Sequence, residues 1–321
     1  MKRRDFCGMV GLNMLLANAA FAQSAYPDRP IKFIVPTSPG SGPDVLARGV
    51  GQLLSASMGQ PVVIENRPGA AANIGFNAIA KAPADGYTIG IVPNQFSINP
   101  LLYKLQFDPS KDFEPLCLIA KGAMVLVTRP TLEVTDLKSF LQLARSKPGG
   151  ISYASAGTGS PHHMAGALLE SISDTKLLHV PYSGVAGAVT AVLGGEVDAT
   201  FMAAQTAAQH VKSGRLRGLA VSTKQGSKVL PDMPSADSAG LPGFDVGFWF
   251  GLMAPVGIPP AVLQRIRTEV QSALSNTELT SSWAKAGLEP FYLPRAEFAA
   301  MIQEDLERWS TLIKRFDIKI E

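Results

Sequence analysis

Residues 31–50 read IKFIVPTSPGSGPDVLARGV, and residues 151–169 read ISYASAGTGSPHHMAGALL. Each stretch starts as an apolar strand, passes through a loop of small residues and a proline, and continues as an apolar helix. Such a loop leaves the N–H groups at the start of the helix unpaired, with the positive end of the helix dipole behind them. Both stretches therefore predict anion-binding loops, and their separation in sequence suggests two lobes that grip one acidic ligand.

The first loop combines glycines and hydroxyls ahead of a proline. Pro43 suits the first position of a helix, where its missing N–H would be unpaired anyway. Asp44 in the first turn favours the helix dipole, and it is also placed to organise the loop or to hold a ligand amine. Taken alone, the segment also fits an ordinary strand-to-helix connection. The candidate ligand-binding residues are Thr37, Ser38, Gly40, Ser41, Gly42 and Asp44.

The second loop has the same plan with a clearer helix start. Ser160 is expected to cap the helix, with Pro161 in its first position. His163 is expected to donate a hydrogen bond to the loop backbone or to ligand, whereas His162 is expected to face solvent. The candidate ligand-binding residues are Ser155, Ala156, Gly157, Thr158, Ser160 and His163.

Two further loops follow predicted strands. Residues 93–97, PNQFS, come after YTIGIV, and residues 182–184, YSG, come after LLHVP. In open parallel sheets, ligands bind outside the carboxyl ends of the strands, so both loops are candidates, although each also fits a plain turn. Gln95, Tyr182 and Gly184 join the candidate ligand-binding residues.

The sequence lacks the signatures of common enzymes and nucleotide sites. Neither loop fits the phosphate-binding or dinucleotide-binding glycine patterns, and no H-E-x-x-H or G-x-S-x-G motif occurs. His162 and His163 are adjacent, so they cannot form the i, i+4 pair that binds a metal on a helix. A hydrolase built on Ser155 or Ser160 would need an orienting acid that the sequence does not place. We therefore expect no enzyme activity, no cofactor and no metal, with a hydrolase that uses Ser160 and His163 as an alternative.

Composition fits a globular, exported protein. The 321 residues are 46% hydrophobic and 17% charged, with a net charge of +3 spread over scattered basic residues, so nucleic acid is not an expected partner. Residues 1–22 have a basic start, a mildly apolar middle and an Ala-Phe-Ala ending at Ala22. They read as an export signal cleaved near Ala22, by the twin-arginine or the general route, and predict a periplasmic protein.

The rest of the chain alternates strand-like and helix-like runs, which indicates an α/β fold with mostly parallel sheets. The run CLIAKGAMVLVTRP looks like a long strand pair that carries the chain between lobes. Cys117 within it is expected to be a buried hydrophobe, and it would be alone after signal cleavage. Near the C-terminus, an apolar stripe at helical spacing predicts core packing; its members are Phe298, Ile302, Leu306, Trp309, Ile313 and Phe316.

Several of these segments together resemble one family. They include YPDRPIKFIVPTSPGSGPDVLAR, GQPVVIENRPGAAANIG, KPGGISYASAGTGSPHHMAG, HVPYSGVAGAVTAVLGGEVDATF and WFGLMAPVGIP. In content and order they resemble the extracytoplasmic solute receptors of tripartite tricarboxylate transporters, the Bordetella uptake gene receptors. The combination covers nearly the whole mature chain and is much more specific than any one motif.

The resemblance implies a two-lobed periplasmic-binding fold of the type II kind, in which each sheet is flanked by helices and the lobes close on a small carboxylate. The expected division is an export signal over 1–22, first-lobe segments over 23–122 and 246–321, and a second lobe over 123–245. The implied partners are the membrane subunits of a tripartite tricarboxylate transporter. Some relatives resemble sensors, so a sensor kinase of a two-component system is an alternative partner.

The first loop departs from the family pattern, which reads closer to P-G-G-G-T-D. Here Ser41 and Pro43 stand in place of a glycine and a threonine. Pro43 removes a hydroxyl and an N–H, and Ser41 adds a hydroxyl. The identity of the ligand therefore stays open among dicarboxylates, tricarboxylates, aromatic acids, amino acids and neutral cyclic compounds.

Overall fold

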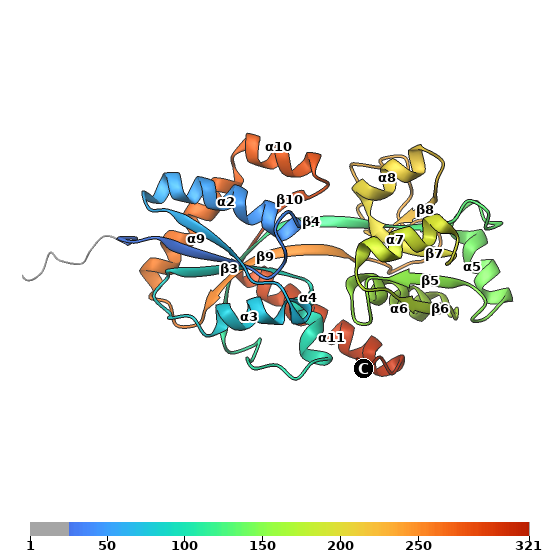
Figure 1. The fold of residues 1–321 in the computed structure, drawn as a ribbon, viewed down its shortest axis with the longest axis horizontal. Helices are drawn as coiled ribbons and strands as arrows, with labels where there is room; N and C mark the ends of the chain where they lie inside the picture. The colour runs from blue at the N-terminus through green and yellow to red at the C-terminus, as the bar shows by residue number, and fades with distance from the viewer. Residues whose placement is uncertain (1–25, 321) are drawn as a thin grey trace, which may run out of the picture.

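The computed structural model describes residues 26–320, which form two lobes joined by long strands (Figure 1). The predicted export signal and its cleavage site lie outside the described residues. Ten strands belong to one continuous sheet within this part of the chain, with the order β2-β1-β3-β9-β4-β7-β5-β6 and with β8 and β10 both paired to β4.

The first lobe has helices on both faces of its part of the sheet. Strands β1, β2 and β3 run parallel, and β1 lies between the other two. Its strands are β1 (Ile31–Val35), β2 (Val62–Asn66) and β3 (Thr88–Pro93); its helices are α2 (Gly42–Met58), α3 (Asn73–Ala80), α4 (Gln95–Ile98), α9 (Pro260–Leu274) and α10 (Thr277–Lys285), with short 3-10 turns η1 (Ala70–Ala72) and η2 (Asn99–Leu101).

The second lobe repeats this plan. Strand β5 lies between β6 and β7 and is parallel to both. Its strands are β5 (Ser152–Ser155), β6 (Leu178–Pro181), β7 (Ala199–Ala203) and β8 (Arg217–Val221), and its helices are α5 (Leu137–Ser146), α6 (Pro161–Ser173), α7 (Val185–Gly194) and α8 (Ala204–Lys212). The carboxyl ends of the parallel strands in both lobes lead into the loops that the sequence singled out.

Two long strands cross between the lobes (Figure 1). Strand β4 (Phe113–Thr128) pairs with β9 (Gly247–Pro255) as far as Ala123, and from Met124 onward it pairs with β7 and β8. The predicted strand pair is therefore wrong: the segment is one unbroken strand whose second half is almost entirely buried. Both crossing strands run antiparallel to their neighbours, so the sheet is mixed rather than mostly parallel.

The C-terminal part of the chain serves both lobes. Strand β10 (Glu289–Pro294) pairs with β4 and leads into α11 (Arg295–Arg315). Phe298 and Ile302 pack in the core of the first lobe, whereas Trp309 and Ile313 pack in the core of the second. The apolar stripe and the packing role of Trp309 are confirmed. The end of α11 is thus buried against the second lobe, although residues 246–321 are expected to complete the first.

Other expectations agree with the structure. The α/β fold in two lobes is confirmed. Cys117 is fully buried in the first-lobe core, and burial raises the pKa of its thiol to about 12, so the side chain is a hydrophobe there. Among the described helices, none combines the length and the apolar character that crossing a membrane requires.

Candidate functional site

The helices that follow the two loops start over the same face of β9. A Cβ atom added to Gly42, the first residue of α2, would lie 3.7 Å from the ring of Phe250. The ring of His162, in the first turn of α6, meets the ring of Phe248 edge-on with the centroids 5.5 Å apart. Phe248 and Phe250 are two positions apart, so their side chains share a face and their Cα atoms are about 7 Å apart. Two helix N-termini from different lobes therefore converge on one short stretch of strand.

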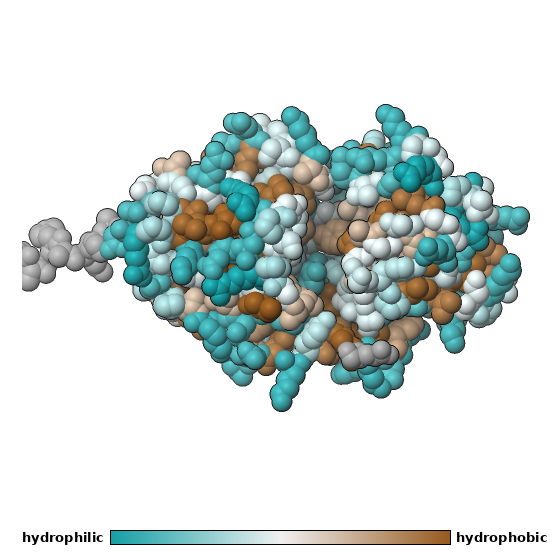
Figure 2. Space-filling model, viewed as in Figure 1, coloured by the Kyte–Doolittle hydropathy of each residue, from teal (hydrophilic) through white to brown (hydrophobic). Residues whose placement is uncertain are grey.

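The surface is hollowed where the two lobes meet (Figure 2). The lobes also touch directly on the two sides of this stretch. A Cβ added to Gly159 would come within 2.4 Å of Leu102 in the other lobe, and one added to Gly287 would come within 2.5 Å of Gln205. At these two contacts glycine backbone packs against a side chain of the other lobe, and a side chain in place of either glycine would collide with it.

The buried carboxylate of Asp44 binds the backbone of the first loop. Its side chain is 3% exposed, and its carboxylate accepts hydrogen bonds from Gly40 N at 2.9 Å, Arg48 Nε at 2.9 Å and Asn66 Nδ2 at 2.8 Å. Burial raises the pKa of Asp44, but the bonds from Arg48, Gly40 and Asn66 outweigh it and hold that pKa below its usual value. Of the roles that the sequence left open, the geometry supports organisation of the loop.

The remainder of the first loop offers backbone donors. Helix α2 starts at Gly42, so Pro43 takes the second helical position rather than the first. The Ser41 hydroxyl bonds to the Thr37 hydroxyl at 2.6 Å and does not cap the helix. Within residues 26–320, the backbone N–H groups of Ser38 and Gly42 have no hydrogen-bond acceptor. These two groups are available to an anion at the helix N-terminus.

The second loop is capped as expected. Ser160 Oγ accepts a hydrogen bond from His163 N at 3.3 Å, and Pro161 occupies the first helical position of α6. The N–H groups of Ala156 and Thr158 have no acceptor in the described part of the chain. Like the first loop, this one therefore presents free backbone donors beside a helix start.

The buried side chain of His163 packs against the inner side of the second loop. Its Nδ1 accepts a hydrogen bond from Gly159 N at 3.0 Å, so the ring contacts the loop backbone as an acceptor and not as the expected donor. Burial, with the neighbouring His179, lowers the pKa of His163 to about 3. An imidazole in this state is neutral at physiological pH and adds no positive charge to the site.

His162 is buried, and the expectation that it faces solvent is wrong. The residue is 5% exposed because the first turn of α6 packs against Phe248 of the crossing strand. Burial lowers the pKa of His162 to about 4, and its Nδ1 has no hydrogen-bond partner among the described residues. Alternation of polar and apolar residues cannot reveal such a contact between lobes.

Ser155 is also turned inward. It is fully buried, and its hydroxyl bonds to Gly157 O at 3.1 Å, to Gly157 N at 3.2 Å and to His179 Nε2 at 2.7 Å. The hydroxyl therefore supports the loop, and no capacity is left for a ligand.

The remaining candidates lie close to these loops. Tyr182 N donates to Ser155 O at 3.0 Å, which places the loop of Tyr182 and Gly184 directly beside the second loop. Gln95 follows Pro93, whose neighbour on β9 is Phe250. The Gln95 Oε1 atom is buried without a partner in residues 26–320. Gln95 therefore brings a polar side chain to the same part of β9 as the two helix starts.

Sequence reasoning missed three supporting residues, because each acts through a contact distant in the chain. Asn66 bonds both Thr37 O and the Asp44 carboxylate. His179 lies under the second loop, and Phe248 lies between the lobes. The only local signal was the position of Asn66 and His179 in or beside predicted strands near the candidate loops.

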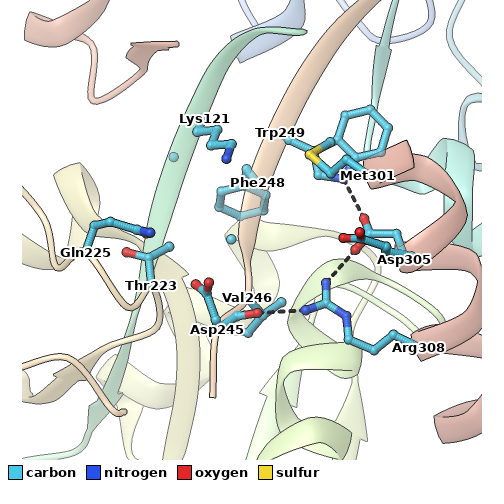
Figure 3. A pocket seen from close by; sticks show the side chains of 13 residues that line it. Lys121, Thr223, Gln225, Asp245, Val246, Phe248, Trp249, Met301, Asp305 and Arg308 are labelled. Atoms are coloured by element: carbon cyan, nitrogen blue, oxygen red, sulfur yellow. Dashed lines mark hydrogen bonds and ion pairs between the residues drawn. The ribbon is translucent and has the colours of Figure 1, made fainter. Parts of the chain in front are cut away.

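A second cavity lies along the crossing strands where Trp249 faces α11 (Figure 3). Its volume is about 340 Å³. Asp305 Oδ2 accepts from Trp249 Nε1 at 2.7 Å, and Arg308 Nη1 donates to Asp245 O at 2.8 Å. Trp249 and Phe248 are consecutive on β9 and point to opposite faces of the strand. The bonds of Asp305 Oδ2 and Arg308 Nη1 thus join α11 to the hinge, whereas Arg308 Nε has no partner in residues 26–320.

The geometry defines a class of protein: a two-lobed binding protein in which helix N-termini and glycine loops from both lobes meet at the hinge strands. Among residues 26–320, no group of three or more His, Cys, Asp and Glu side chains could hold a metal ion.

Comparison with known proteins agrees with this class. The model of the family described as tripartite tricarboxylate transporter family receptor matches residues 46–318. BugT from Bordetella pertussis is 32% identical over 329 residues, and the alignment covers 100% of each chain. This chain belongs to the tripartite tricarboxylate transporter receptor family.

Two solved structures of relatives carry ligands. The R. palustris protein Rpa4515, solved with adipate, is 29% identical with a TM-score of 0.79 over 92% of this chain and 99% of that one. MatC from Rhodopseudomonas palustris, with bound malate, is 29% identical with a TM-score of 0.73 over 90% of this chain and 100% of that one.

Proposed function

We propose that this protein captures a small organic carboxylate between its lobes and presents it to the membrane subunits of a tripartite transporter. One observation carries the proposal: two helices from different lobes start over the same face of β9, and each follows a glycine loop that has free backbone N–H groups. A carboxylate that bridges them would accept charge-assisted hydrogen bonds from both lobes at once.

The ligand would be held by neutral donors. In the first loop, Ser38 N and Gly42 N are available, and in the second, Ala156 N and Thr158 N are available. The carboxylate of Asp44 is already bonded by Gly40, Arg48 and Asn66, so its charge is offset. Family members that carry malate and adipate support a dicarboxylate as the first class to test.

We also propose that the ligand leaves chemically unchanged. Ser160 Oγ bonds the backbone of His163 and not its ring, whose Nδ1 is occupied by Gly159 N. Ser155 does bond a histidine ring, that of His179, but the serine is fully buried and its hydroxyl also bonds Gly157. A serine nucleophile needs an accessible hydroxyl and an oriented base, and neither pair supplies both.

The export signal expected over residues 1–22 would take the mature protein to the periplasm, where a receptor meets ligands that enter the cell envelope. The proposed division into lobes follows the crossing strands, with the C-terminal end of α11 counted with the second lobe. Transport from this compartment needs a closed, ligand-loaded receptor that a membrane partner can distinguish from the open form.

A calorimetric titration tests the proposal. Ligand-free protein, refolded after denaturation and dialysis, is titrated with malate, adipate, citrate, benzoate and glutamate, and with malamide and adipamide as uncharged controls. We expect at least one carboxylate to bind and its amide not to bind. At a ligand concentration of 100 Kd, the binding carboxylate should stabilise the fold by about 2.7 kcal/mol. Equal binding of acid and amide, or binding by none of the five acids, would count against a carboxylate receptor.

A further inference from the structure

Two histidines from different elements stack directly beneath the second loop. His163 belongs to α6 and His179 to β6, and their ring centroids are 3.8 Å apart with an angle of 2° between the planes. The ring of Tyr153 in β5 lies against His179, with a centroid separation of 5.0 Å and an angle of 33° between the planes. The pair therefore has a fixed position, set by three elements of the second lobe.

Each ring bonds a different part of the loop. His163 Nδ1 accepts from Gly159 N at 3.0 Å, near the end of the loop. His179 Nε2 lies 2.7 Å from Ser155 Oγ, at the start of the loop. Gly159 has a φ of 75° and Gly157 a φ of 114°, so the backbone between these two bonds adopts conformations that only glycine takes readily. The two histidines thus bond both ends of residues 155–159, and the backbone conformation of this segment depends on these bonds.

The hydrogen bonds assign the tautomers. Because His163 Nδ1 is an acceptor, the proton of the neutral ring is on Nε2. The Ser155 hydroxyl has one hydrogen, which the contact with Gly157 O at 3.1 Å uses. Its oxygen then accepts from His179, so the proton of His179 is also on Nε2. With its proton on Nδ1, His163 could no longer accept a hydrogen bond from Gly159 N, and His179 could no longer donate one from Nε2 to Ser155 Oγ.

The histidine pair borders a cavity. The cavity has a volume of about 560 Å³ and lies between the second lobe and the C-terminal segment 315–319. Tyr153, Glu170 and both histidines line it. Thr158 of the loop lines the same cavity, so the loop and the histidine pair border it together.

We propose that His163 and His179 are positioning residues, two neutral imidazoles that hold residues 155–160 in the shape that binds ligand without contacting the ligand themselves. The loop geometry stands on the contacts above, and the consequence for binding rests on the proposed function. His163, expected from the sequence to meet ligand, and His179, absent from that expectation, act here as one unit.

Crossed substitutions separate hydrogen bonding from space filling. Asparagine places an oxygen where His163 has Nδ1, whereas glutamine places its amide nearer the Nε2 position. H163N therefore keeps an acceptor for Gly159 N, and H163Q does not. For His179 the order reverses, because H179Q keeps a donor toward Ser155 and H179N does not. All four variants lose the ring stack equally, and H210N in α8, outside the loop, serves as the control.

Amide hydrogen exchange of the ligand-free protein is the first readout, followed on Gly159 for His163 variants and on Gly157 for His179 variants. We expect protection to fall at least tenfold in H163Q and H179N, and less than threefold in H163N and H179Q. The Kd for whichever dicarboxylate binds, malate or adipate, should rise in the same order. Equal losses within each pair would overturn the proposal in favour of space filling alone.

A measurement on the unmodified protein covers the case in which the variants do not fold. Two-bond proton–nitrogen correlation spectra at pH 7 report which nitrogen of each imidazole carries the proton. We expect the Nε2–H form for both His163 and His179. An Nδ1–H form or an imidazolium at either residue would contradict the assignment, whether or not the protein binds a carboxylate.

Discussion

At the scale of single residues, a buried carboxylate organises the first ligand loop. Asp44 gathers bonds from the loop at Gly40, from its own helix at Arg48 and from β2 at Asn66. A negative charge in the first turn also suits the helix dipole. A residue that would repel an anion if it faced the cleft instead fixes the donors that attract one.

Asp44→Ala should destabilise the protein by about 2–3 kcal/mol, because it leaves Gly40 N without its acceptor and removes one of the two acceptors of Asn66 Nδ2. The folded-state pKa of Asp44 is lowered, so its contribution is present above its ordinary value near 4 and disappears as pH falls through the folded pKa. Urea unfolding of wild type and variant at pH 7 and pH 3 measures this. Arg67→Ala is the control, because Arg67 forms a partly exposed ion pair with Glu65 and should cost less than about 1 kcal/mol. A D44A loss that is the same at both pH values would contradict the account.

His162 should make the fold sensitive to mild acid. Its pKa is about 4 in the folded protein against 6.5 ordinarily, so the unfolded chain binds more protons between these values and stability falls as pH drops from about 6.5 to about 4. The slope for one such group is about 1.4 kcal/mol per pH unit. H162Q should reduce the loss of unfolding free energy between pH 7 and pH 5 relative to wild type. An identical pH dependence in both proteins would show that His162 is not held neutral.

At the scale of elements, the two crossing strands come closest at a pair of glycines. A Cβ added to Gly247 would lie 2.6 Å from Gly122 O, a clash with backbone that cannot move aside cheaply. A Cβ added to Gly122 would meet nothing nearer than 3.7 Å. The hinge therefore needs a glycine at one of these positions and tolerates a side chain at the other.

Gly247→Ala should accordingly lower stability by about 1–3 kcal/mol, as expected for overpacking, whereas Gly122→Ala should change it by less than about 1 kcal/mol. Thermal unfolding of the two variants beside wild type compares them directly. A loss of stability in G122A as large as that in G247A would contradict the close approach of Gly247 to Gly122 O.

Elements with strong local patterns were predictable, and contacts between distant segments were not. The capped start of α6 at Ser160 and the apolar stripe of α11 each follow from residues close in sequence. The stacking of His163 on His179 and the burial of His162 depend on how α6 meets β6 and β9. Strand β4 was mistaken for a pair because its length exceeds that of most strands.

At the scale of the whole molecule, the lobes are joined by more than the two hinge strands. Helix α11 packs its first half in one lobe and its second half in the other, and Arg315 bonds Ser171 Oγ of α6 at 2.8 Å. Lobe motion that opens the cleft therefore has to preserve or rearrange this third connection.

The central claim is that loops from both lobes grip one carboxylate, and hydrogen exchange with and without ligand tests it most directly. The protein is saturated with the carboxylate that binds in calorimetry, and peptides covering residues 37–44 and 155–160 are followed together. The account predicts that exchange slows in both loops on binding, with H210N behaving as wild type does. Protection confined to one loop, or binding that leaves both loops unchanged, would contradict a clamp formed by the two lobes.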